Sequence, residues 1–254
     1  MCTPSLQVAC KDLRPDVRTD MARGHPRHDR GLMASTTASI DETRPGAWDV
    51  VARLGAVDGA VAHPHATRLI QSAPAQRNLS DAVHAFCDVY GRHPGMIDDA
   101  LLRGAQLGSL PWLETAATGF AIERGYLAQL TAAVGPLPST PGQAATEAAL
   151  AGVRNALEIL SGSERAGCAT GAVAALLHDW AVTRDVLDLA ATRFGIVAPP
   201  RALPPADVSA KAVATLGATP GTRRAITFGA QQLYAQHRGL WSLLEARASA
   251  RGDL

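Results

Sequence analysis

The apolar residues of this chain recur every three or four positions over most of its length after residue 44, and this spacing constrains the fold more than any other feature. Such a period places apolar side chains on one face of an α-helix, whereas a half-buried strand needs strict alternation. No segment alternates for long enough to indicate a strand. The pattern therefore predicts an all-α fold.

Four long helices are expected, at about residues 112–134, 144–160, 164–194 and 220–247. Glycine and proline mark where they end, and three N-cap signals mark where they begin. Thr140 with Gln143 forms a capping box, Ser161 with Glu164 forms a second, and Thr219 precedes Pro220 at the last helix. With shorter outer helices, these segments indicate a helical bundle.

Residues 1–44 differ from the rest of the chain. They show no periodicity and are rich in arginine, aspartate, proline and threonine, so we expect a disordered N-terminal extension. The extension carries charges throughout and has no apolar core of secretory length, which argues against a signal peptide. Translation from Met1 and translation from Met33 both stay open. Residues 45–250 are expected to form a single all-α domain.

Composition excludes several classes of protein. The formal net charge of +1 argues against a nucleic-acid-binding protein, which would carry a basic face. No run approaches the roughly 18 consecutive apolar residues that a membrane span needs. The four cysteines have no paired spacing, so we expect reduced thiols in the cytoplasm.

Two ionisable residues interrupt apolar helical stripes. Glu123 lies within the stripe of the first long helix, and His237 lies within the stripe of the last. Burial of an isolated charge is costly, so each residue must neutralise or find a partner. Either Glu123 and His237 meet, or each meets another buried polar group. His178 and Asp179, on the third long helix, are the candidate partners.

Known metal-site patterns fit this chain poorly. A di-iron bundle needs Glu-x-x-His pairs, and no glutamate is followed by histidine at that spacing. One Asp-x-x-His pair, Asp81 with His84, falls in the expected first turn of a helix, where aspartate favours the helix dipole. The segment ALLHDW resembles the signature of HD-domain phosphohydrolases, which would give His178 and Asp179 metal-binding roles, but the usual following glycine is absent. We therefore expect no metal and no cofactor.

Small residues dominate the segment GCATGAV, residues 167–173. Their side chains would let another helix approach closely, so we interpret this segment as a packing site. It does not match a phosphate-binding loop, which would end in lysine followed by serine or threonine.

The segments GPLPSTPGQ, with the helix after it, and FGAQQLYAQHRGLWSLLEAR resemble a bacterial family of uncharacterised, all-helical, cytoplasmic proteins. The resemblance runs from about Leu79 to Arg247 and implies a fold and a setting, with no activity. Two hypotheses for function follow. One is a non-enzymatic helical module that binds an unknown protein or small molecule, with homodimerisation left open. The alternative is a metal- or proton-transfer enzyme that uses Glu123 and His237.

Overall fold

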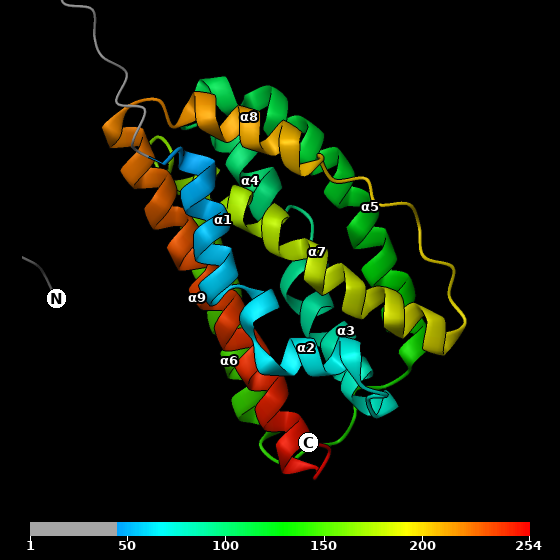
Figure 1. Cartoon of the computed structure of the whole chain (residues 1–254). Helices are drawn as coiled ribbons and strands as arrows, with labels where there is room; N and C mark the ends of the chain where they lie inside the picture. Colours follow the sequence, from blue (N-terminus) through cyan, green and yellow to red (C-terminus); the bar gives the residue numbers. More distant parts are fainter. Residues whose placement is uncertain (1–44) are drawn as a thin grey trace, which may run out of the picture. The chain divides into compact units, whose positions relative to one another are not determined.

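The computed structural model describes residues 45–254, and these residues form α-helices, short 3-10 helices and the loops between them (Figure 1). No strand occurs in this part of the chain, so the all-α prediction is confirmed. The predicted disordered extension, with Cys2, Cys10 and Met33, lies outside the described residues.

The long helices are α5, α6, α7 and α9, of 25, 19, 27 and 31 residues. The full order is α1 (Ala47–Asp58), η1 (Ala60–Ala62), α2 (Pro64–Gln71), α3 (Gln76–Tyr90), α4 (Met96–Arg103), η2 (Leu107–Ser109), α5 (Leu110–Val134), α6 (Gln143–Ser161), α7 (Cys168–Phe194), α8 (Ala206–Leu216) and α9 (Pro220–Ala250).

One of the three N-cap predictions is confirmed. The Thr219 hydroxyl accepts the backbone N–H of Thr222 at 3.2 Å, at the start of α9. The other two are wrong. The N-caps of α6 and α7 are Gly142 and Gly167, which have φ values of 81° and 101°. A side chain at such φ values would be strained, so glycine makes these helix entries.

The helix α7 is the centre of this arrangement. In Figure 1 it crosses between α9 on one side and α5 on the other, and its side chains are buried over most of its length. The apolar core gathers around it, and two buried tryptophans, Trp180 of α7 and Trp241 of α9, are among its largest side chains.

Helices α7 and α9 touch through their backbones. A Cβ atom at Gly171 would lie 2.0 Å from the carbonyl oxygen of Ile226, and one at Gly229 would lie 2.0 Å from the carbonyl oxygen of Cys168. Only glycine permits this approach, because a real Cβ atom would overlap the partner backbone. The interpretation of residues 167–173 as a packing site is therefore confirmed.

Replacing Gly171 by alanine should lower the free energy of unfolding by about 1–3 kcal/mol, because the two helices must move apart and the packed core is strained. Gly152 is the matched control, since it lies within α6 and a Cβ atom there would meet nothing within 4 Å. Gly152→Ala should instead stabilise by about 0.5–1 kcal/mol. Urea unfolding of both variants tests the prediction, and equal effects of the two changes would contradict it.

Candidate functional site

His237 is paired with Asp179 and not with Glu123. The imidazole Nδ1 lies 2.6 Å from Oδ2 of Asp179, and Nε2 is hydrogen-bonded to the hydroxyl of Tyr90. The other carboxylate oxygen of Asp179 accepts the backbone N–H of Ala60 at 2.7 Å. These contacts join α7, α9, α3 and η1 through a single chain of hydrogen bonds, which we call the buried relay.

The buried relay is sealed from solvent. His237 is 0%, Asp179 2% and Tyr90 4% exposed, and the rings of Phe86 and Trp180 stand against it. Burial raises the pKa of Tyr90 well above its ordinary value, and the nearby Asp179 carboxylate raises it further. Tyr90 thus keeps its proton and can donate it to Nε2 of His237, while Nδ1–H donates to Asp179. The buried relay therefore holds these helices to one another.

Glu123 has a different partner, Arg184. Its Oε1 lies 2.6 Å from Nη1 of Arg184, and its Oε2 accepts the indole N–H of Trp180 at 3.0 Å. Arg184 also donates from Nε to Asp188 at 2.7 Å and to the carbonyl oxygen of Pro199. Every heteroatom of this ion pair therefore has a partner, as a buried pair requires.

A cavity of about 370 Å³ opens beside the ion pair. Glu123, Trp180 and Arg184 line it together with the half-buried ring of His178, whereas the exposed side chains of Ala181 and Arg201 also reach it. We call this space the tryptophan cavity, because Trp48 and Trp180 both border it. Its remaining lining residues are Leu177, Leu203, Pro204, Ala206 and Ser209.

His178 is held at the edge of the tryptophan cavity by Tyr234. Nδ1 of His178 lies 3.1 Å from the Tyr234 hydroxyl, and Trp48 meets the imidazole edge-on with ring centroids 5.9 Å apart. Burial lowers the pKa of His178, so the imidazole is neutral at pH 7. Within residues 45–254, its Nε2 has no hydrogen-bond partner.

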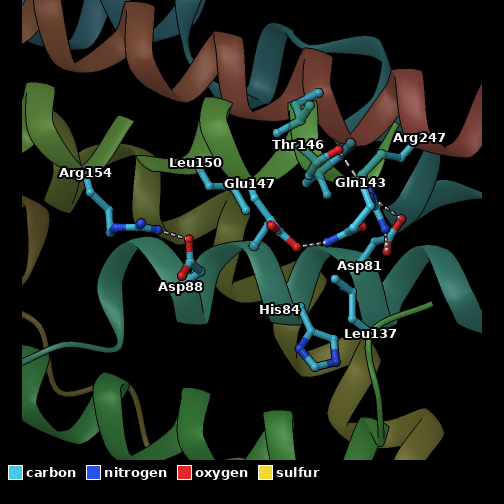
Figure 2. Close-up of a pocket in the computed structure, with 13 residues that line it drawn as sticks. Asp81, His84, Asp88, Leu137, Gln143, Thr146, Glu147, Leu150, Arg154 and Arg247 are labelled. Carbon is cyan, nitrogen blue, oxygen red and sulfur yellow. Dashed lines mark hydrogen bonds and ion pairs between the residues drawn. The ribbon is translucent and has the colours of Figure 1, made fainter. Parts of the chain in front are cut away.

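A second cavity, of about 260 Å³, lies between α3, α6 and α9 (Figure 2). On its wall Asp81 accepts two hydrogen bonds from Arg247, both of 3.0 Å. Arg247 also donates to Gln143, Thr146 and the carbonyl oxygen of Pro138, so all of its N–H groups are used.

Asp81 also binds a second arginine, Arg251, near the end of the chain. Arg251 adds a further hydrogen bond to Asp81, of 2.6 Å, and donates to the Thr140 hydroxyl at the same distance. That contact gives Thr140 a role other than the predicted cap. Asp81 also lies beyond the first turn of α3, which begins at Gln76, so the helix-dipole interpretation of Asp81 is wrong.

The four candidate residues thus fall into two groups. Glu123 and His178 line the tryptophan cavity, whereas Asp179 and His237 belong to the buried relay. Sequence reasoning missed Arg184 and Tyr90 as partners. Arg184 follows Trp180 by four residues, so the two share a face of α7, and that spacing was the available signal.

In the part of the chain that the structure describes, no three His, Cys, Asp or Glu side chains are grouped closely enough to hold a metal ion. His178 and Asp179 are neighbours in sequence, but they have different hydrogen-bond partners. His178 pairs with Tyr234, whereas Asp179 pairs with His237. Among the helices of residues 45–254, none combines the length and the apolar character that a membrane crossing requires.

A protein-family model matches most of the chain. The model described as "Family of unknown function (DUF6975)" matches residues 55–252, which is most of the chain and extends beyond the expected range at both ends. This finding agrees with the predicted resemblance to an uncharacterised family. No curated protein and no solved structure matches the chain.

Two double-mutant cycles separate the buried groups. Glu123→Gln and His237→Gln should have additive effects on the free energy of unfolding, within about 0.5 kcal/mol, because the two residues share no hydrogen-bond partner. Asp179→Asn and His237→Gln should instead show a coupling of about 0.5–3 kcal/mol. Urea unfolding measures both cycles, and a strong coupling between Glu123 and His237 would contradict this structure of the core.

Acid should destabilise the fold between pH 6.5 and 4. Burial lowers the pKa of His63 and His178, and it lowers the pKa of His65 from 6.5 to about 4. As the pH falls, the unfolded chain therefore binds protons at these histidines before the folded chain does. The contribution of the neutral histidines to the free energy of unfolding is fully present above pH 6.5 and is lost toward pH 4.

His65→Leu should reduce that loss, because His65 is 2% exposed and its Nδ1 is buried without a partner among the described residues. Thermal melts of both proteins at pH 7 and 4.5 provide the comparison. An equal drop in the two proteins would show that His65 does not contribute.

Proposed function

The chain belongs to the DUF6975 family of unknown function, and from that premise we propose that it is a non-enzymatic module that binds a small, neutral, largely apolar molecule in the tryptophan cavity. The observation that carries this proposal is the cavity itself. Its volume of about 370 Å³ lies within the range of small-molecule sites, roughly 300–1,000 Å³.

The lining supports an apolar ligand. The rings of Trp48 and Trp180, with Leu177, Leu203 and Pro204, form an apolar wall, and the charged residues Glu123 and Arg184 at the cavity are paired with each other. Aromatic walls with a small number of placed polar groups are typical of sites for small organic molecules.

The charges at the cavity support a neutral ligand. Glu123 is compensated by Arg184. Arg201, at the exposed side, lies 2.5 Å from Asp185 and 3.1 Å from Asp188. A charged ligand would have to displace one of these partners, and it would pay for its own desolvation against an apolar wall.

The alternative, a metal- or proton-transfer enzyme using Glu123 and His237, has weaker support. Proton transfer requires a group within hydrogen-bond reach of a substrate. His237 is 0% exposed and does not line the tryptophan cavity, and both oxygens of Glu123 already accept hydrogen bonds within the protein. This geometry favours binding over catalysis.

We also propose a cytoplasmic setting, because Cys87 and Cys168 form no disulfide within residues 45–254, as is usual in a reducing compartment. A bacterial origin and a homodimer stay predictions.

Ligand-observed NMR with 1-methylindole, a neutral aromatic probe without a hydrogen-bond donor, tests the proposal. A probe of about ten non-hydrogen atoms should bind with a dissociation constant on the order of 1 mM. Ala181→Trp should abolish saturable binding, because Ala181 is an exposed residue of the cavity lining. A tryptophan side chain at this position would obstruct the cavity.

Ala148→Trp is the matched control. Ala148 is also an exposed alanine within a long helix, α6, but it lines neither cavity described above. Binding that persists in Ala181→Trp, or that both variants lose equally, would contradict the proposed site.

A further inference from the structure

We infer that the ligand of the tryptophan cavity carries an N–H or O–H donor, and that Nε2 of His178 accepts the hydrogen bond from it. This inference rests on the proposed function and specifies the chemical class of the ligand. The class is a neutral aromatic or apolar molecule with one exposed donor, such as an indole or a phenol.

Tyr234 determines which nitrogen of His178 carries the imidazole proton. Its hydroxyl is buried, and it donates to the backbone carbonyl oxygen of Val51 at 3.2 Å. A hydroxyl has one proton to donate. With that proton directed to Val51, the oxygen of Tyr234 accepts from Nδ1 of His178, 3.1 Å away. Nδ1 then carries the imidazole proton.

The neutral state of the ring determines the role of Nε2. A neutral imidazole with a proton on Nδ1 has a lone pair on Nε2 and can only accept there. Nε2 has no partner in residues 45–254, yet it is not among the side-chain atoms sealed from solvent. Because Nδ1 faces the buried Tyr234 and His178 lines the cavity, Nε2 is the nitrogen left for a ligand.

The ring is held in this orientation by α1. A Cβ atom at Gly55 would lie 2.7 Å from Nδ1 of His178 and 2.7 Å from the hydroxyl oxygen of Tyr234. The absence of a side chain at Gly55 lets both rings approach the helix. A ring fixed by Gly55, Tyr234 and Trp48 needs little reorganisation on binding, which favours specific recognition of a donor.

The side-chain oxygens of Glu123 and Ser209 on the inner wall each already accept a hydrogen bond within the protein. Both oxygens of Glu123 accept from Arg184 and Trp180. The oxygen of Ser209 accepts the indole N–H of Trp112 at 3.3 Å. Nε2 of His178, by contrast, accepts no hydrogen bond from residues 45–254, and a ligand that lacks a donor would leave it unsatisfied.

Indole and 1-methylindole form a matched pair of probes, because only indole has an N–H donor. Their dissociation constants should be measured by ligand-observed NMR for the full chain and for His178→Phe. The preference for indole over 1-methylindole should be about tenfold greater in the unsubstituted protein than in the variant. Comparing the two ratios removes the contribution of the added methyl group.

The outcomes distinguish the two proposals. Equal ratios in both proteins, with binding retained, would overturn the donor inference and leave the proposed function standing. Failure of both probes to bind the unsubstituted protein would overturn the proposed function itself.

A measurement on the unsubstituted protein keeps the inference testable if His178→Phe does not fold. The ¹⁵N chemical shifts of the His178 ring report which nitrogen carries the proton. We expect the proton on Nδ1, with a change at Nε2 when indole is added. A proton on Nε2 in the free protein would overturn the inference.

Discussion

The carboxylate of Asp179 is the group on which the arrangement of the core depends. It is 2% exposed, and a buried carboxylate without partners would cost several kilocalories per mole or would be neutralised. Its two oxygens meet that cost by holding His237 of α9 and the backbone of η1. Because His237 in turn holds Tyr90 of α3, a shift of any of these elements would break a bond that the interior cannot replace.

The charge of Glu123 is also buried, and Arg184 compensates it. The pair lies at the tryptophan cavity, where water or a ligand could compete for its hydrogen bonds, yet each charged atom already has a protein partner. The Arg184 guanidinium also lies over the ring of Tyr126, 4.4 Å from its centroid. The polar end of the cavity is therefore internally paired, and in the binding mode that we propose the neighbouring neutral imidazole contacts the ligand.

Helical periodicity was sufficient to predict the fold class, and it also identified Glu123 and His237 as buried polar residues. It could not predict their partners, since the face of a helix is set by local spacing whereas a contact depends on how helices cross. Arg184 and Arg247 escaped notice because long arginine side chains usually reach solvent, and here both are buried. The caps at Thr140 and Ser161 failed because glycines with positive φ made those helix entries.

His178 and Asp179 connect the candidate site to the core. Consecutive residues of a helix point about 100° apart, so one short segment of α7 sends Asp179 to the buried relay and His178 to the tryptophan cavity. Tyr234 and His237 are three residues apart on α9. Tyr234 is hydrogen-bonded to His178, and His237 is hydrogen-bonded to Asp179. The orientation of the cavity imidazole and the register of the two central helices thus depend on the same backbone. A ligand that binds His178 only when this backbone is in place stabilises the folded state through its own binding free energy.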